Sequence, residues 1–112
     1  MRVEELARCR DLDVLDLITT GRITGVLRNT ELWFVYDAGN LYVLAEHSYA
    51  TQWVKNIIRE SRVRVKLGQL EFRGVARVLD PERDNQAWNR VQQLAVEKYG
   101  WGDGLPVEIT PN

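Results

Sequence analysis

Two arginines near the start of the chain lie at a short turn that glycines bound. Arg22 lies within the turn at residues 21–25, and Arg28 follows a little further along. A guanidinium group can hold a phosphate through two parallel hydrogen bonds, which a lysine cannot do. The hydroxyls of Thr24 and Thr30 lie nearby in the sequence. This spacing predicts a phosphate site, and the alternative it leaves open is a hairpin whose arginines are simply solvated.

A second group of polar residues follows the apolar run that ends at Ala45. It consists of Glu46, His47 and Ser48, and His47 is the only histidine of the chain. A single histidine excludes a multi-histidine metal site, and Cys9 is too distant in sequence to suggest a metal motif. His47 and Ser48 are candidates for bonding the polar edge of a ring or a substrate. The alternative is an exposed polar loop.

Four tryptophans are many for a chain of 112 residues. Large aromatic side chains usually fill cores or interfaces, and the helical spacing around Trp53 and Trp88 predicts that both pack inward. Trp101 follows a helix stop and stands between two glycines. It is therefore the tryptophan that could instead cover a cofactor or contact a partner subunit.

Length and charge bound the class of protein. The length fits one domain over residues 1–112, and 45% apolar content is normal for a globular core. A net charge of −1 and a pI near 5.8 provide no overall positive field for nucleic acid or an anionic membrane. The longest apolar runs fall short of the ~20 residues that span a bilayer. With one cysteine and no leader pattern at the start, we expect a cytoplasmic setting.

The segments that must position these residues alternate between strand and helix patterns. Residues 1–9 indicate a short helix, and period-2 or short apolar runs bounded by turn signals indicate strands. The segment 50–60 has an apolar helical stripe, and Asp80-Pro81 is typical of a helix start, leading to a helix that ends near Gly100. Pro106 restricts the last strand to an edge or to beginning there. The predicted strands are residues 14–20, 26–36, 41–45, 62–67, 70–79 and 107–110.

This order predicts a mainly β fold of the α+β type, an antiparallel split β-barrel of about six strands with two main helices. Most of the connecting turns are too short to be the crossovers that a parallel sheet requires. The first three strands form a meander, and the strand at residues 62–67 alternates apolar and basic residues. Its basic side, continued by Arg73 and Arg77, is expected to be a solvated sheet face.

The ordered motifs resemble the deazaflavin-dependent nitroreductase family, within the FMN-binding, pyridoxamine-phosphate-oxidase-like split β-barrels. The opening segment is similar to the family signature T-T-G-R-x-[ST]-G-x-x-R-x-x-P-L, and Trp53 with Asn56 is similar to its W-x-x-N-L helix. Two departures stand out: Glu31 replaces the signature proline, and residues 46–49 replace a Ser-x-Gly-Gly loop. Ile23 stands where deazaflavin binders often have lysine. The matching segments are residues 19–32, 42–45, 53–57, 62–65 and 76–79.

The resemblance implies an oxidoreductase that binds FMN or a deazaflavin coenzyme, unresolved between the two, and reduces a quinone-like or nitroaromatic acceptor. It also implies a homodimer with the cofactor in a groove between subunits. The alternative function is a non-catalytic flavin- or deazaflavin-binding module, a carrier or a sensor. No catalytic residue is assigned, because the cofactor supplies the chemistry. The expected cofactor-binding residues are Arg22, Thr24, Arg28, Thr30, Ala45, Glu46, His47, Ser48, Trp53 and Trp101.

Overall fold

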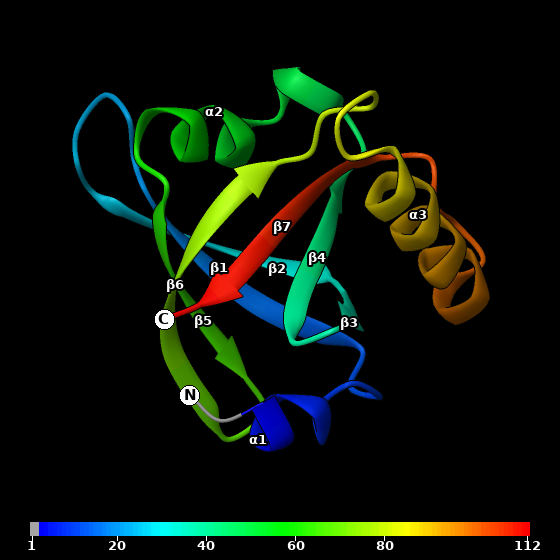
Figure 1. Cartoon of the computed structure of the whole chain (residues 1–112). Helices are drawn as coiled ribbons and strands as arrows, with labels where there is room; N and C mark the ends of the chain where they lie inside the picture. The colour runs from blue at the N-terminus through cyan, green and yellow to red at the C-terminus, as the bar shows by residue number, and fades with distance from the viewer. Residues whose placement is uncertain (1–2) are drawn as a thin grey trace.

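An antiparallel sheet curls around the core of the computed structural model, which describes residues 3–112 (Figure 1). Within these residues the sheet has seven strands in the order β2-β1-β5-β6-β7-β4-β3. The predicted split barrel with two main helices is confirmed. The strands are β1 Val14–Thr20, β2 Leu27–Trp33, β3 Val35–Asp37, β4 Asn40–Ala45, β5 Arg62–Leu67, β6 Leu70–Val78 and β7 Leu105–Pro111.

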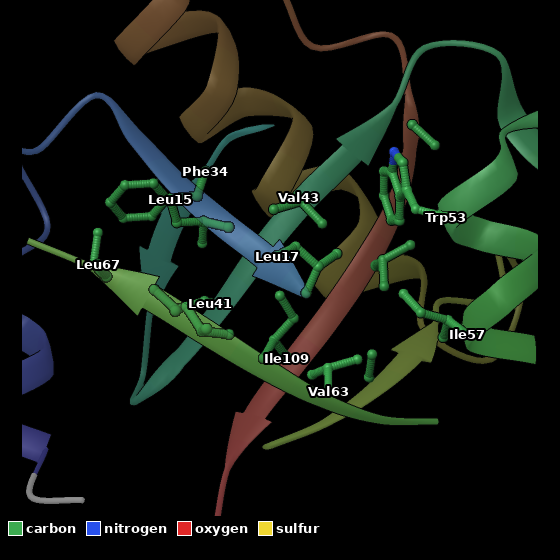
Figure 2. Close-up of a cluster of buried hydrophobic side chains, with 14 of the residues drawn as sticks. Leu15, Leu17, Phe34, Leu41, Val43, Trp53, Ile57, Val63, Leu67 and Ile109 are labelled. Atoms are coloured by element: carbon green, nitrogen blue, oxygen red, sulfur yellow. The ribbon is translucent and has the colours of Figure 1, made fainter. Parts of the chain in front are cut away.

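Alternation along the strands builds the core. In β5 the valines and Leu67 are buried while the basic residues between them are exposed, as the period-2 pattern predicts. Figure 2 shows these side chains meeting others from β1, β4 and β7 inside the curl. Trp53 and Ile57 of α2 (Gln52–Arg59) point into the same cluster and close one end of it.

The predicted strand over residues 26–36 is divided at Phe34. The Phe34 N–H donates to the Tyr99 hydroxyl at 3.1 Å, and the Phe34 carbonyl accepts from Lys98 Nζ at 3.1 Å. These backbone groups therefore bond helix side chains rather than a neighbouring strand. The chain leaves its pairing with β1 at Trp33 and begins pairing with β4 at Val35. This break accounts for the seventh strand.

Within residues 3–112, three α-helices pack against the sheet (Figure 1). The short helix α1 (Val3–Ala7) inserts Leu6 into the core, and the first two residues of its predicted range lie outside the described part of the chain. The long helix α3 (Asn85–Tyr99) lies beside β3 and β4 and ends at Gly100 in the left-handed conformation, as predicted. A 3₁₀ turn, η1 (Ser48–Ala50), precedes α2. No helix between residues 3 and 112 is long and apolar enough to cross a membrane.

The start of the long helix differs from the prediction. Asp80 does cap a turn, because its Oδ1 accepts the N–H groups of Glu82 and Arg83 at 2.8 and 2.9 Å. That turn is a single one, and the continuous helix begins at Asn85. Asp84 separates the turn from the helix, since its carboxylate accepts from the Asp80 N–H at 2.8 Å and from Arg77 at 2.9 Å.

Pro106 lies in an interior strand, so the edge-strand alternative is wrong. β7 has β6 on one side and β4 on the other. Pro106 is the second residue of β7, which agrees with the alternative that a strand begins there. The pairing of β6 with β7 ends at Val78 and Val107, so the missing N–H of Pro106 falls just beyond the ladder.

Candidate functional site

A groove of about 620 Å³ opens where the strand breaks at Phe34, between the two main helices. Its size is within the range of about 300–1,000 Å³ that small-molecule sites occupy. Its walls are mainly apolar and aromatic, with a few polar groups at the rim. We call this space the aromatic groove, and its lining residues are Glu31, Leu32, Trp33, Phe34, Val35, Tyr42, Leu44, Glu46, His47, Thr51, Trp53, Ala95, Tyr99 and Trp101.

One wall of the aromatic groove is a stacked pair of rings. Trp33 and Tyr99 are parallel within 2°, with centroids 4.6 Å apart. The Tyr99 hydroxyl accepts the Phe34 N–H, and the carbonyl oxygens of Asp13 and Phe34 lie 2.7 and 2.8 Å from it as acceptors for its own proton. Burial raises the pKa of Tyr99, so the phenol stays protonated at neutral pH. The ring is therefore fixed, and it holds the half-exposed Trp33.

Lys98 supports this wall from behind. Its ammonium donates to the carbonyl oxygens of Arg10, Leu12 and Phe34 at 2.9, 2.6 and 3.1 Å. It also lies 3.9 Å from the Phe34 ring centroid and 5.0 Å from that of Tyr99. Burial lowers the pKa of Lys98. This cation is occupied by protein groups and does not line the groove.

Trp101 reaches the groove through a loop that only glycines allow. Gly100 has a φ of +76°, which turns the chain at the helix end. A Cβ on Gly102 would lie 2.3 Å from the Gln92 carbonyl oxygen, and one on Gly104 would lie 2.8 Å from the Trp101 ring. The Gln92 side-chain amide donates to the Gly104 carbonyl at 3.2 Å. The loop is thus packed tightly on α3, with Trp101 against the groove.

The opposite wall comes from the start of α2. Trp53 is 7% exposed and belongs to both the core and the groove. Thr51 is the residue before the helix, and its Oγ1 is buried without a hydrogen-bond partner among the described residues. A buried hydroxyl without a partner costs roughly 1–3 kcal/mol, so a bound polar group at this point would be stabilised. This orphaned oxygen is the clearest sign that the groove accepts a ligand with a polar edge.

Tyr42 forms the floor, and its hydroxyl is bonded away from the groove. It donates to Glu108 Oε2 at 3.0 Å, and Glu108 in turn lies 3.5 Å from Arg77. Burial, with the Glu108 hydrogen bond, raises the pKa of Tyr42 to about 12. Arg77 also binds Asp84 at 2.9 Å. The network ties β4, β7 and the turn before α3 together, and it fixes the floor of the groove.

The charges at the groove rim are acidic. Glu31 and Glu46 are exposed there with His47, and no arginine or lysine of residues 3–112 lines the groove. Asp16 lies directly opposite Glu31 in the β1–β2 register, which adds a second carboxylate beside it. No three His, Cys, Asp or Glu side chains in the described chain gather as a metal site.

The predicted phosphate turn lies outside the groove, and Arg22 is bonded within the protein. Its guanidinium donates to Asn56 Oδ1 at 3.0 Å and to Gln52 Oε1 at 2.8 Å, both on α2. Asn56 is 5% exposed and passes the network on by donating to Thr19 Oγ1 at 3.2 Å. Arg22 thus bonds the hairpin to α2, and Asn56 of the W-x-x-N-L motif is the residue of α2 that bonds both Arg22 and Thr19.

Arg28 is the free member of the pair. It is exposed and makes no ion pair or side-chain hydrogen bond with any of residues 3–112. In the register of β1 and β2 it lies opposite Thr19, and Thr30 lies opposite Leu17, so both are on the inner face of the sheet. Thr24 is at the turn, where its Oγ1 accepts the Val26 N–H at 3.2 Å.

The structure therefore separates the predicted residues into two groups. Glu46, His47, Trp53 and Trp101 line the aromatic groove, with Ala45 and Ser48 adjacent to them in the chain. Arg22, Thr24, Arg28 and Thr30 belong to the β1–β2 hairpin. Their roles toward a cofactor stay predictions. Sequence reasoning missed the groove residues Trp33, Tyr42, Thr51 and Tyr99. The only signal for any of them was the high number of tryptophans, which includes Trp33.

A second, smaller hollow of about 350 Å³ lies on the outer face of the sheet. We call it the basic hollow, because three arginines contribute to it. Arg64 and Arg73 are directly opposite in the β5–β6 register, and Arg62 pairs with Glu60. The expectation of a solvated basic face agrees with the exposure of these arginines. Its lining residues are Ile18, Thr20, Leu27, Glu60, Arg62, Val63, Arg64, Arg73, Gly74 and Asn112.

The fold of the chain is similar to that of several solved structures. The heme storage protein HutZ from Vibrio cholerae aligns with a TM-score of 0.74 and 21% identity over 100% of this chain and 92% of its own. A putative pyridoxamine 5′-phosphate oxidase from Listeria innocua gives 0.77 and 18% over 97% and 91%. The F420-H2 dependent reductase FDR-A gives 0.68 and 24% over 90% and 95%.

The family follows from the sequence itself. A sequence model of the F420H(2)-dependent quinone reductase family matches residues 2–110, so the chain belongs to that family. No curated protein matches it significantly. F420 is a deazaflavin, so the resemblance to deazaflavin-dependent split barrels is confirmed. The family is one of deazaflavin-dependent reductases, which agrees with one of the two cofactors expected from the sequence.

The groove fits a flat redox cofactor of this kind. It offers aromatic walls, a volume of about 620 Å³ and an orphaned buried hydroxyl, Thr51 Oγ1, to meet a polar ring edge. Its rim has no cation among the lining residues, so an anionic tail has to extend elsewhere. Arg28 lies on the inner face of β2, outside the groove lining, and is exposed. The sequence predicted Arg28, together with Arg22, as a phosphate ligand, and this role stays a prediction.

Proposed function

We propose that the chain is a deazaflavin-dependent reductase that acts on a quinone-like or nitroaromatic acceptor. The observation that carries the proposal is the aromatic groove with the unpartnered Thr51 hydroxyl in a chain that belongs to the F420H(2)-dependent quinone reductase family. When bound, the reduced deazaflavin supplies the hydride. The protein supplies orientation, exclusion of water and a hydrogen bond at the ring edge.

The two ends of the groove have different roles in this proposal. Thr51 and Trp53, at the start of α2, hold the ring of the cofactor, with Thr51 Oγ1 as the polar contact. His47 lies on the same lining. Trp33, at the end of β2, and Tyr99, at the end of α3, hold the acceptor against the ring. The stacked pair is rigid because the Tyr99 hydroxyl is bonded to backbone groups.

The hairpin holds the anionic tail in this proposal. Arg28 is exposed and without a protein partner in the described chain, so it is available to a phosphate. Arg22 contributes indirectly, because its bonds to Asn56 and Gln52 fix the hairpin against α2. Thr30, on the same face of β2 as Arg28, adds a hydroxyl. Thr24 shapes the turn through its bond to the Val26 N–H.

We also propose a homodimer in the cytoplasm. The hairpin extends beyond the rest of the sheet in Figure 1, and it exposes Ile23 by 85%, Val26 by 54% and Leu27 by 56%. Apolar residues gathered at a protruding tip are typical of surfaces that a second copy covers. Dimerisation would bring a second chain to the free face of β2, where Arg28 and Thr30 lie. The free thiol of Cys9 fits a reducing compartment.

Calorimetric titration of the purified protein with F420 and with FMN tests which cofactor it binds. We expect saturable binding of F420 and weaker binding of FMN. Oxidation of reduced F420 in the presence of menadione or a nitroimidazole, followed by absorbance, tests the activity. The absence of both F420 binding and acceptor reduction would overturn the proposal. Tight F420 binding without reduction of any acceptor would instead favour the non-catalytic carrier or sensor.

The oligomeric state has its own test. Sedimentation velocity at micromolar concentration should give the mass of two chains for the native protein. Ile23→Ser together with Leu27→Ser should shift it toward one chain, because both residues are exposed at the tip and neither is in the core. The matched control is Ile58→Ser, an exposed isoleucine on α2. A native monomer would remove the dimer from the proposal.

A further inference from the structure

The acceptor end of the aromatic groove combines stacked rings with carboxylates and lacks a cation. Glu31 and Trp33 are neighbours on β2, and both line the groove with Tyr99 and Trp101. The face of an indole carries negative partial charge, and it attracts a cation placed above it. Carboxylates beside the ring add to this attraction. The same surroundings repel an anion of similar shape.

Among residues 3–112, no cation pairs with the carboxylates of this end. Asp16 lies opposite Glu31, and it also faces Lys66 across to β5, so the Asp16 charge is partly balanced while Glu31 is not. Lys98 is the nearest ammonium to Tyr99, and it is taken up by three backbone carbonyls. Glu46 adds another carboxylate at the rim. Neither Glu31 nor Glu46 forms an ion pair with a residue of the described chain.

We propose that this subsite, made by Trp33, Tyr99, Glu31 and Glu46, selects cationic planar heteroaromatic acceptors over anionic ones. The inference rests on the proposed reductase function and gives it a substrate class. A ring of the N-alkylquinolinium or N-alkylphenazinium type would stack on the free face of Trp33 with its charge near the carboxylates.

The chemistry of hydride transfer suits such an acceptor. A cationic ring gains one hydride, which is two electrons and one proton, from the reduced deazaflavin and becomes neutral. The donor loses two electrons in all and releases its second proton to solvent, so atoms and charges balance. The neutral product no longer experiences the attraction of Glu31 and Glu46. Binding is therefore selective before the transfer and release is favoured after it.

The first test measures binding without any cofactor, so it does not depend on turnover. Calorimetry compares three probes of similar shape at low salt, which are 1-methylquinolinium, neutral quinoline and naphthalene-1-sulfonate. We expect the cation to bind about tenfold more tightly than quinoline, and the anion more weakly than quinoline. The preference should shrink as salt is raised. Equal or tighter binding of the sulfonate, or no binding of any probe, would overturn the inference.

Variants locate the selectivity. Glu31→Gln together with Glu46→Gln should reduce cation binding to about the level of quinoline and leave quinoline binding unchanged. Trp33→Ala should weaken all three probes, because it removes the stacking surface. Glu97→Gln is the control for the loss of a carboxylate outside the groove, since Glu97 is exposed on α3 and does not line the groove. A loss of cation preference in Glu97→Gln as large as in the double variant would also overturn the inference.

A parallel measurement separates this inference from the proposed function. Reduced F420 is oxidised with neutral menadione, cationic N-methylphenazinium or an anionic naphthoquinone sulfonate as acceptor. If menadione is reduced but the rates do not depend on the charge of the acceptor, the inference is wrong and the proposed reductase function stands. If the probes bind selectively by charge but no acceptor is reduced, the proposed reductase function is wrong and the cation-selective subsite stands.

Discussion

The aromatic groove and the basic hollow are two depressions of one sheet with opposite surroundings. The groove lies between α2 and α3, with aromatic walls fixed by backbone bonds and acids at its rim. The hollow lies on the open outer face, and its arginines are solvated. Charges in open water are screened, whereas a dry aromatic wall holds a ligand by area and direction. The comparison teaches that the arginines of the sheet gather outside the larger and mainly apolar of the two depressions.

Each depression contains a like-charged pair across neighbouring strands, and the two pairs differ. Asp16 faces Glu31 beside the groove, but Lys66 lies on the other side of Asp16. Arg64 faces Arg73 in the hollow, and the neighbour of Arg64 on β1 is the neutral Ile18. The repulsion between the arginines is therefore uncompensated along that row. This repulsion between exposed side chains lowers the stability of the sheet only slightly.

The largest expected effect is a loss of stability at the groove, in a variant that leaves the hollow unchanged. Trp53→Ala should lower the free energy of unfolding by about 3–5 kcal/mol, because it leaves a cavity in the core that no neighbour fills. Urea unfolding followed by circular dichroism measures it. Trp33→Ala is the matched control, a half-exposed tryptophan of the same groove that should lose far less stability. Similar losses in both variants would show that the groove is not an extension of the core.

The two hairpin arginines should separate stability from affinity. Arg22→Ala should reduce stability by about 1–3 kcal/mol, because it removes the guanidinium bonds to Asn56 Oδ1 and Gln52 Oε1. The backbone N–H at residue 22 still donates to Asn56 Oδ1 at 3.2 Å. Arg28→Ala should leave stability nearly unchanged and weaken F420 binding by a similar amount, as expected for a lost charged hydrogen bond. Thermal unfolding and calorimetric titration of both variants check this. Full F420 affinity in Arg28→Ala would remove it as the phosphate ligand.

The floor of the groove predicts an alkaline effect. Tyr42 ionises near pH 10 in the unfolded chain and only at about pH 12 in the folded one. The folded state thus binds more protons between these values, so stability falls as pH rises through this window. Tyr42→Phe should lose about 0.5–1.5 kcal/mol at pH 8 through the missing bond to Glu108, and its further decline above pH 10 should be shallower. Parallel slopes in urea unfolding at pH 8–11 would contradict the assignment.

The smallest expected effect lies in the hollow. Arg73→Gln should raise stability by about 0.2–1 kcal/mol at low salt, because it removes the repulsion with Arg64. The gain should disappear in 1 M salt, where the Debye length is about 3 Å. Arg62→Gln is the control, since Arg62 is paired with Glu60. A loss of stability in Arg73→Gln would mean that the hollow holds its cations for a structural reason.

Local patterns predicted most of the elements but not the site. The alternation at residues 62–67 determines a strand, because a one-residue slip would expose its whole apolar set. The apolar stripe around Trp53 likewise determines a helix. The break at Phe34 could not be predicted, since its cause is a pair of side chains on a helix more than sixty residues later in the chain. Residues 26–36 read as one strand until α3 supplies Lys98 and Tyr99.

The same distinction holds for the candidate site. The sequence by itself determined the barrel, its family resemblance and the residue types that suit a flat anionic cofactor, because periodicity and turn chemistry act over short distances. Only the tertiary structure decided that Arg22 is bonded to α2 while Arg28 stays free, and that Trp33 and Tyr99 stack into a wall. Side chains distant in sequence become neighbours only when the sheet curls and α3 packs against it. The groove exists through that packing, and no local pattern encodes it.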